Sequence, residues 1–220
     1  MEVRLPDEKL TFLHQTLLEW VKKSTTNLQG LRELTSFLQF ASQVIPHSCA
    51  FIHHLINFST TFSSPFAVQH IPAYAHTDIA WWHTYTITWN GKCLIDAPYP
   101  TTYVYTDASG PKGLGSIFNT YWFSSRLPRH FYSRDIQFKG IYTVLQAILH
   151  WGHLWKHHHV IFHIDNSAIV NTISKDTNCS HFTISVVHLI VMLTVSLEFS
   201  FSSSWLSSSM NSLADSASCF

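Results

Sequence analysis

Apolar side chains recur every three or four residues through the first hundred positions of the chain. An amphipathic α-helix has this period, because 3.6 residues make one turn. The spacing predicts two helices near the start, with apolar positions at Leu10, Leu13, Leu17 and Val21 in the first and at Leu31, Leu34, Leu38, Ala41 and Ile45 in the second. We expect residues 27–30 to separate these helices and Pro46 to end the second, because proline cannot continue a helix.

Two more helices are predicted before residue 100. A short one is centred on residues 51–56, where apolar residues keep the same spacing. The other begins at Thr77–Asp78, a pair typical of helix N-caps, and ends at Asn90–Gly91, a pair typical of C-caps. Residues 1–100 are therefore predicted to form a small helical segment.

The pattern changes after this segment, where strands become the better interpretation. Residues 102–106 are β-branched and aromatic, as strands often are, and 160–164 is a short apolar run typical of a strand buried on both faces. Further strands are predicted at 114–123, within 126–137, and around 199–201, where phenylalanine alternates with serine.

Helical spacing returns between and after these strands. It is found at 141–155, after Asn166, at 182–197 and after Asn211–Ser212. A strand meander followed by alternating elements predicts an α/β domain over residues 101–220, in which helices flank a mixed five-stranded sheet. The segment 182–197 is apolar but shorter than the roughly 18 to 20 residues that span a bilayer, so we interpret it as a buried helix.

The charged residues narrow the function classes. Only 12% of the 220 residues are charged, and 13 basic residues balance 13 acidic ones, so a strongly basic nucleic-acid binder is not indicated. The first ten residues lack the apolar core of a signal peptide, and the four cysteines lie far apart without a CxxC pair. We therefore expect an intracellular protein, cytoplasmic or nuclear, that is not secreted and has no membrane partner.

Three aspartates stand where predicted strands end or a predicted helix begins. Asp107 follows the strand 102–106, Asp165 follows the strand 160–164, and Asp215 lies in the first turn of the last helix. If the two strands are parallel neighbours, their acids meet at one edge and the third can close the cluster. Such oxygen ligands suit Mg²⁺ or Mn²⁺, and two such ions can clamp the attacking and leaving oxygens of a phosphodiester. The alternative for each aspartate alone is a turn or helix cap.

The residues around these aspartates resemble the ribonuclease H domain of retrotransposon polyproteins, above all that of DIRS-like elements. The likeness is carried by Tyr-Thr-Asp107-Ala-Ser with Gly113-Leu-Gly115, by Phe-His-Ile-Asp165-Asn-Ser-Ala and by Asn211-Ser-Leu-Ala-Asp215. Three further parts of the chain resemble the thumb and connection that follow the polymerase palm in such elements: residues 4–9, residues 31–34 with 40–41, and residues 81–82 with 89–91.

This resemblance implies a ribonuclease-H-like fold and metal-dependent cleavage of the RNA strand of an RNA–DNA hybrid. It implies that Asp107, Asp165 and Asp215 are the catalytic residues and the metal ligands, with Mg²⁺ or Mn²⁺ as the cofactor. The hybrid, or another nucleic acid, would be the partner. Because the polymerase palm is not in this chain, a reverse transcriptase palm on another chain is a further candidate partner.

Two departures from the family's pattern bear on activity. The family has a fourth acid, a glutamate in the first turn of the helix after the third strand, typically in a Lys-Glu-Leu/Ile-Tyr context. Here that context is Lys139-Gly140-Ile141-Tyr142, and no glutamate occurs between Glu33 and Glu198. Asp135 lies five residues earlier and is a poor substitute. Three serines at 207–209 replace the Pro-Gly turn that is usual before the last helix.

These departures leave two hypotheses open. The chain is either a ribonuclease-H-like hydrolase impaired at Gly140, or a non-catalytic remnant that keeps the fold and weak nucleic-acid binding. The basic residues that could follow a phosphate backbone beside the acids are Lys112, Arg126, Arg129, Arg134 and Lys139. The alternative is that they form a scattered, solvated face. We interpret the run at 157–159, three histidines, as a solvated turn, because consecutive side chains rarely converge on one metal ion.

Overall fold

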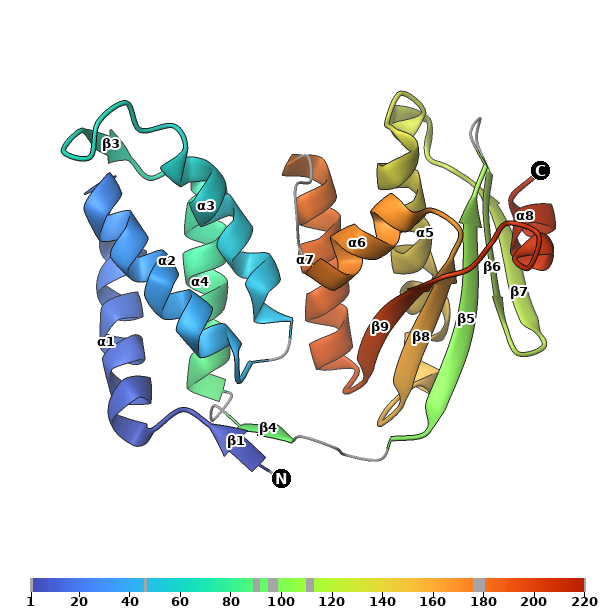
Figure 1. Ribbon diagram of the computed structural model, residues 1–220, viewed down its shortest axis with the longest axis horizontal. Coiled ribbons are helices and arrows are strands. Elements are labelled where there is room, and N and C mark those ends of the chain that lie inside the picture. Colours follow the sequence, from blue (N-terminus) through green and yellow to red (C-terminus); the bar gives the residue numbers. More distant parts are fainter. Residues whose placement is uncertain are drawn as a thin grey trace. The chain divides into compact units, whose positions relative to one another are not determined.

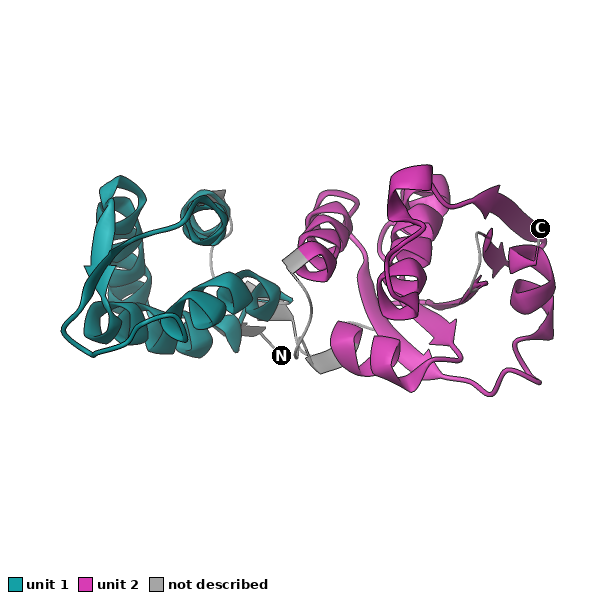
Figure 2. Ribbon diagram, turned by 90° about the horizontal axis from the view of Figure 1, so that it is seen from above, with its two compact units in different colours: residues 1–97 teal, residues 98–220 magenta. Residues whose placement is uncertain are grey.

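The chain forms two compact units, Met1–Ala97 and Pro98–Phe220, which Figure 2 shows in different colours. The computed structural model describes residues 2–45, 47–88, 92–94, 99–109, 113–175 and 181–219. Figure 1 labels most of the helices and strands of both units. Each unit has buried apolar side chains of its own.

The first unit is mainly helical. Its helices are α1 (Asp7–Lys22), α2 (Leu28–Ser42), α3 (His53–Ser59) and α4 (Ala73–Thr88), with a 3₁₀ helix, η1, at Ser48–Ile52. Most of the predicted apolar positions are buried, among them Leu13, Leu17 and Leu31. Val21 is 39% exposed, however, so the helical period identified the core-facing stripe except at the end of α1. Asn27 caps α2 by accepting a hydrogen bond from the Gly30 N–H at 2.9 Å, so this helix begins inside the segment that was expected to separate it from α1.

Helix α4 begins earlier than predicted. It starts at Ala73, directly after Pro72, whose carbonyl oxygen accepts two N–H groups of the first turn. Asp78 was expected at the N-cap, but it lies within the helix and is fully buried, where it accepts hydrogen bonds from His54. The N-cap prediction at Thr77–Asp78 was wrong, because the Asp78 carboxylate accepts hydrogen bonds from His54, which is distant in the sequence, and not from the backbone of its own helix.

Two short antiparallel strand pairs in the first unit were not predicted. β1 (Glu2–Arg4) pairs with β4 (Lys92–Leu94), and β2 (Thr25–Asn27) pairs with β3 (Val68–His70). Three residues are too few for an alternating pattern to be recognised in a sequence. The predicted helix ends at Pro46 and at Asn90–Gly91 lie outside the described residues.

The second unit is built on one mixed five-stranded sheet. Its strands are β5 (Thr101–Ala108), β6 (Gly113–Phe118), β7 (Tyr121–Arg126), β8 (His159–Ile164) and β9 (Ser200–Trp205). They lie in the order β7-β6-β5-β8-β9. β6 runs antiparallel to both β5 and β7, whereas β8 runs parallel to both β5 and β9. The predicted mixed sheet is therefore confirmed.

The prediction of one strand over 114–123 was wrong. This segment forms a hairpin in which β6 and β7 are joined at Asn119–Thr120, and Asn119 has a φ of 52°, which asparagine adopts more readily than most residues. No proline or glycine marks the turn in the sequence, so two short strands looked like one. The third strand expected within 126–137 is also absent there; this segment holds the 3₁₀ helix η2 (Arg129–Phe131) and the start of a helix.

Helices cover both faces of the sheet. They are α5 (Ile136–Trp151), α6 (Ser167–Lys175), α7 (His181–Ser196) and α8 (Ser212–Ser218), all labelled in Figure 1. The short 3₁₀ helix η3 (Gly152–Leu154) follows α5. Phe118 of β6 contacts Trp151 of α5, whereas Gly113 and Gly115 of the same strand face α8. Because alternate strand positions point to opposite faces, α5 and α8 lie on opposite sides of the sheet.

Helix α7 contains the apolar segment that was predicted to be a buried helix. Ile190 and Val191 are buried, but Leu189 and Met192 are 42% and 48% exposed, so the prediction holds for one face only. Among the described residues, no helix combines the length and the apolar character that a membrane crossing requires.

Candidate functional site

Two of the three candidate acids, Asp107 and Asp165, lie at the same edge of the sheet. β5 and β8 are parallel neighbours, and Thr106 lies beside Ile164 in their register. Asp107 directly follows Thr106 and Asp165 directly follows Ile164, so both carboxylates lie at the carboxyl ends of adjacent strands. This is the edge at which open α/β sheets usually bind ligands.

Helix α8 carries the third acid, Asp215, in its first turn. This helix can lie close against β6 because the strand has glycine residues where α8 crosses it. A Cβ atom at Gly115 would lie 2.5 Å from the Ser218 nitrogen and 2.6 Å from the Ala214 carbonyl oxygen, and a Cβ atom at Gly113 would also collide with the helix backbone. The two glycines of the Gly-Leu-Gly motif therefore set the close approach that places Asp215.

Asn211 anchors α8 to β5. Its side chain is almost completely buried, and Nδ2 donates a hydrogen bond to the Thr106 carbonyl oxygen at 3.1 Å. Asn211 precedes the helix as expected, but its side chain makes no capping hydrogen bond. Its described contact thus joins the start of α8 to the end of the strand that carries Asp107.

The three aspartates line one pocket of about 670 Å³. They reach it from three different elements: the end of β5, the segment after β8, and α8. The residues that line it are Thr106, Asp107, Ala108, Ser109, Ile136, Gly140, Ile164, Asp165, Asn166, Ser167, Ile169, Asp215 and Cys219. The structure therefore brings the three sequence-predicted acids together.

Two serine hydroxyl groups hold carboxylates of this pocket. Ser218 Oγ donates to Asp107 Oδ2, and Ser208 Oγ donates to Asp165 Oδ2 at 2.9 Å. The Trp205 indole N–H donates to the Asp165 carbonyl oxygen at 2.9 Å. Sequence reasoning missed both serines, because each lies far along the chain from its acid. It had treated the serine loop at 207–209 only as the loss of a turn motif.

Burial raises the pKa of Asp107 above its ordinary value. The negative charges of Asp165 and Asp215 raise this pKa further, whereas the hydrogen bonds from Ser218 and from the Ala108 backbone lower it. Asp107 is thus a half-buried carboxylate whose charged form is disfavoured by its surroundings. A cation in the pocket would offset that unfavourable electrostatic energy.

The acids fit a hard divalent cation. Their ligand oxygens do not all lie within 4.8 Å of one another, so one ion would contact one or two carboxylates directly and the rest through water. Mg²⁺ commonly binds in this way, since it dehydrates reluctantly and keeps several water ligands. Asp107, Asp165 and Asp215 would hold such an ion.

The pocket holds no acid at residue 140, where the resemblance to ribonuclease H domains implies a fourth one. Gly140 lines the pocket from α5, beside the apolar side chains of Ile136 and Ile169. Asp135 does not replace the glutamate, because it is the N-cap of α5 and accepts a hydrogen bond from the Phe138 N–H at 2.7 Å.

The five basic residues predicted to contact nucleic acid differ in their surroundings. Arg126 and Arg129 are exposed, and the guanidinium of Arg134 lies 3.6 Å from the ring centre of Phe182, a cation–π contact. Lys139 is only 6% exposed, so its ammonium group is poorly placed to meet a phosphate. Lys112 lies outside the described residues.

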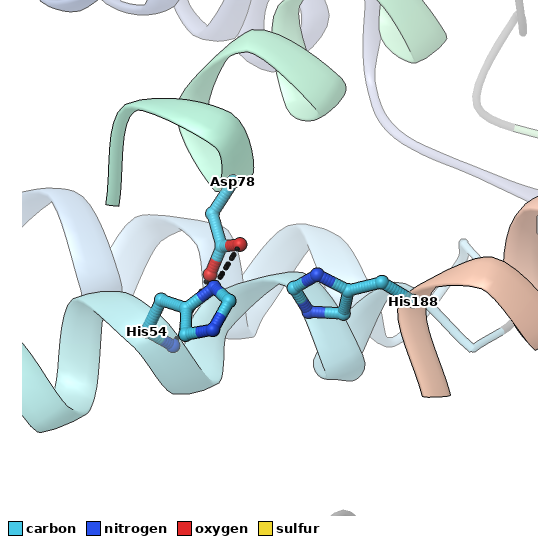
Figure 3. Close-up of side chains that lie close together, drawn as sticks. All are labelled: His54, Asp78 and His188. Carbon is cyan, nitrogen blue, oxygen red and sulfur yellow. Dashed lines mark hydrogen bonds and ion pairs between the residues drawn. The ribbon is translucent and has the colours of Figure 1, made fainter. Parts of the chain in front are cut away.

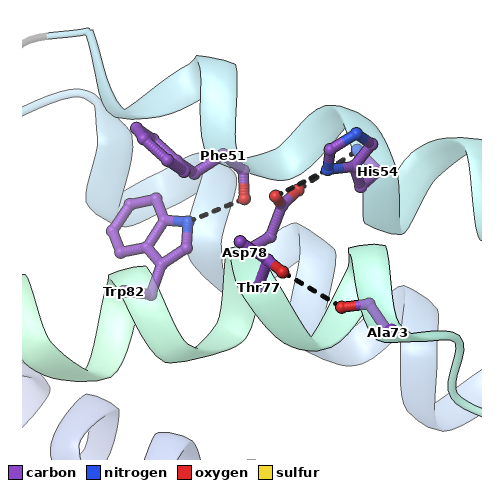
Figure 4. A network of polar contacts seen from close by, with 6 residues as sticks. All are labelled: Phe51, His54, Ala73, Thr77, Asp78 and Trp82. Carbon is purple, nitrogen blue, oxygen red and sulfur yellow. Dashed lines mark hydrogen bonds and ion pairs between the residues drawn. The ribbon is translucent and has the colours of Figure 1, made fainter. Parts of the chain in front are cut away.

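The first unit contains a buried polar pair that sequence reasoning also missed. His54 Nδ1 lies 2.8 Å from Asp78 Oδ1, and the His54 backbone N–H donates to Asp78 Oδ2 at 3.2 Å, as Figure 3 shows for the two side chains. Figure 4 adds the neighbouring contact, in which the Trp82 indole N–H donates to the Phe51 carbonyl oxygen at 3.1 Å. These bonds join α3 and η1 to α4.

Comparison with known proteins gives matches among solved structures only. No family model and no curated protein matches the chain. RNase H1 from the halophilic archaeon Halobacterium salinarum is 9% identical, with a TM-score of 0.43 over 53% of this chain and 93% of that one. The foamy viral protease-reverse transcriptase in complex with an RNA/DNA hybrid is 14% identical, with a TM-score of 0.35 over 91% of this chain and 27% of that one.

A further structure of the foamy viral protein, in complex with double-stranded DNA, is 13% identical, with a TM-score of 0.33 over 91% of this chain and 35% of that one. The chain thus spans between 25% and 41% of the foamy viral polypeptides that it matches. Its own strand order and flanking helices make the second unit a ribonuclease-H-like α/β domain, as predicted.

Proposed function

We propose that the second unit is a metal-dependent domain for RNA–DNA hybrids whose ancestral reaction is hydrolysis of the RNA strand, now impaired at Gly140. The observation that carries this proposal is the pocket in which Asp107, Asp165 and Asp215 meet from three separate elements. Three negatively charged carboxylates around one pocket repel one another, and a bound cation would lower this unfavourable electrostatic energy.

The chain's own residues would hold the cation and orient the reacting phosphate. A bound Mg²⁺ or Mn²⁺ supplies a Lewis acid that polarises the phosphoryl group and lowers the pKa of water. Asp107, Asp165 and Asp215 would hold this ion, one or two of them directly and the rest through water. Ser218 and Ser208 each occupy one carboxylate oxygen by hydrogen bonding, which restricts how Asp107 and Asp165 can turn.

Gly140 is the reason to expect slow turnover. The resemblance assigns an acid to this position, and glycine has neither a ligand atom nor a proton acceptor. Removal of one ligand from a site that stabilises a phosphoryl transition state costs several kcal/mol, which is on the order of a thousandfold in rate.

Nucleic acid would meet the exposed side chains of Arg126 and Arg129, with Arg134 as a further candidate. Such contacts release counterions from the phosphate backbone, so binding should weaken as salt rises. With 13 basic and 13 acidic residues, the chain offers little net attraction for a polyanion, and we expect modest affinity.

The wider assignment follows the same resemblance. We propose that the chain belongs to a DIRS-like retroelement polyprotein and that residues 1–100 correspond to its thumb and connection. A reverse transcriptase palm on another chain is then the expected protein partner. Reconstitution of hybrid binding with such a palm, and its loss when residues 1–100 are replaced by an unrelated helical segment, would test this assignment.

The decisive experiment measures cleavage and binding of an RNA–DNA hybrid whose RNA strand is labelled. The full chain is compared with Asp107→Asn, and Asp7→Asn serves as the matched control because Asp7 lies on α1 of the other unit. We expect the wild type to bind the hybrid only when Mn²⁺ or Mg²⁺ is present and to cleave its RNA strand slowly. Asp107→Asn should lose both binding and cleavage, whereas Asp7→Asn should keep them. Folded protein that binds neither the ion nor the hybrid would refute the proposal.

A non-catalytic remnant is the second candidate, and the glycine at 140 favours it. This candidate predicts ion-dependent hybrid binding without any cleavage. Turnover by the wild-type chain that disappears in Asp107→Asn would exclude it.

A further inference from the structure

We infer that the pocket holds a single divalent cation, on its aspartate side, and that the side chain of Ile169 excludes the ligand that a second cation would need. This inference rests on the proposed function, since it concerns the metal content of the same pocket. It differs from the simple loss of an acid, because it assigns the exclusion to a neighbouring residue.

The pocket has two chemically different walls. All three carboxylates come from β5, from the segment after β8, and from α8. The wall formed by α5 and α6 contributes Ile136, Gly140 and Ile169 instead, and Ser167 at the start of α6 brings a neutral hydroxyl only. Hard divalent cations need anionic oxygen ligands, so this wall offers them no site comparable with the aspartate side.

The space beside Gly140 is already filled. A Cβ atom at this position would lie 2.1 Å from Ile169 Cδ1, whereas the next atom of the same side chain, Cγ1, is at 3.4 Å, an ordinary contact distance. One methyl group therefore stands where any side chain at residue 140 would begin. Cδ1 is the free end of the side chain, but Ile169 is only 3% exposed, so this methyl group would have to turn among closely packed neighbours.

This arrangement makes the two positions interdependent. An acid at residue 140 has to displace Ile169 Cδ1 unless residue 169 lacks that atom. Valine is isoleucine without that atom, so Ile169→Val removes the obstructing methyl group and little else. The geometry predicts that Gly140→Glu fails to create a second ion site alone and succeeds when combined with Ile169→Val.

The test counts ions instead of measuring activity. Purified full-length chain is titrated with Mn²⁺, and free Mn²⁺ is followed by electron paramagnetic resonance. We expect one bound ion per chain in the wild type and in Gly140→Glu, and two in Gly140→Glu/Ile169→Val. Ile173→Val is the matched control, because Ile173 is also buried on α6 but lies outside the 4 Å surroundings of Gly140. Paired with Gly140→Glu, it should leave one ion.

A stability cycle provides a second readout that needs no acid. Gly140→Ala should lower the thermal midpoint, because its Cβ atom meets Ile169 Cδ1. Ile169→Val should reverse most of that loss, and Ile173→Val should not. Additive effects of Gly140→Ala and Ile169→Val would contradict the steric argument even if a glutamate variant failed to fold.

The outcomes separate this inference from the proposed function. A wild type that binds no Mn²⁺ removes the proposed function itself. Two ions in the wild type, two ions in Gly140→Glu alone, or one ion in the Gly140→Glu/Ile169→Val chain would each overturn the role of Ile169 while leaving a metal-dependent site in place.

Discussion

The close crossing of α8 over β6 predicts a large effect from one added methyl group. In Gly115→Ala, the new Cβ atom would lie 2.5 Å from the Ser218 nitrogen, 2.6 Å from the Ala214 carbonyl oxygen and 2.7 Å from the Ala217 carbonyl carbon. All three are backbone atoms of α8, so no side chain can turn aside to make room. The helix must retreat by about 0.9 Å to reach the 3.4 Å at which ordinary contacts begin.

The substitution should lower both the stability of the second unit and its affinity for Mn²⁺. Overpacking of a tight interior contact costs about 1–3 kcal/mol. For a unit of this size that corresponds to a fall of roughly 4 °C in the thermal midpoint per kcal/mol. The same retreat moves Asp215 and Ser218 away from Asp107, so Mn²⁺ should bind at least about tenfold more weakly, equivalent to the loss of about 1.4 kcal/mol.

The assay pairs thermal unfolding with Mn²⁺ titration, at a temperature where the variant is folded. Gly30→Ala is the matched control, because Gly30 lies on a helix of the other unit. The nearest atoms to its added Cβ atom all belong to side chains, namely Asn27 Oδ1 and Thr26 Oγ1 at 3.3 Å and Trp20 Cζ2 at 3.9 Å. We expect the control to bind Mn²⁺ as the wild type does. If Gly115→Ala retains both the midpoint and the affinity, the argument that glycine positions α8 is wrong.

Two further predictions concern buried groups. Asp78→Ala should lower the free energy of unfolding of the first unit, measured in urea, by about 1–3 kcal/mol, because the buried donors of His54 lose this acceptor. Thr77→Ala removes an exposed hydroxyl group and should be nearly neutral. Equal losses in the two variants would contradict the role of the His54–Asp78 pair. Burial lowers the pKa of His163 below its ordinary value of about 6.5, so its contribution to stability is complete above that pH and is lost as pH falls through the lowered pKa. The unfolding midpoint of the wild type should therefore drop more steeply below about pH 6.5 than that of His163→Gln, and parallel curves would refute this.

The acid positions could be predicted because they depend on regular features of the sequence. A β-branched run ending in Asp107 and an apolar run ending in Asp165 identify two strand ends, and parallel pairing puts these ends at one edge. The turn at Asn119 could not be found in this way, because neither proline nor glycine marks it and the flanking residues suit one strand as well as two.

The partners of the acids were beyond sequence reasoning for a different reason. Ser218 lies 111 positions from Asp107, and Ser208 lies 43 positions from Asp165. No local pattern couples residues at such separations, and the choice of one serine among several depends on where α8 and its preceding loop lie. Asp78 is the converse case, because its sequence neighbours suggested a helix cap while a residue 24 positions away takes its hydrogen bonds.

The hydrogen bond between Ser218 and Asp107 also constrains the order of folding. Since the two residues lie almost at opposite ends of the second unit, their loop closes late, after the strand pairings of shorter sequence separation have formed. A nascent chain would expose β5 to β8 at the ribosome well before α8 emerges. The affinity for a divalent ion that we propose would therefore appear only once α8 has been made and has docked, and its appearance would report that the second unit has folded.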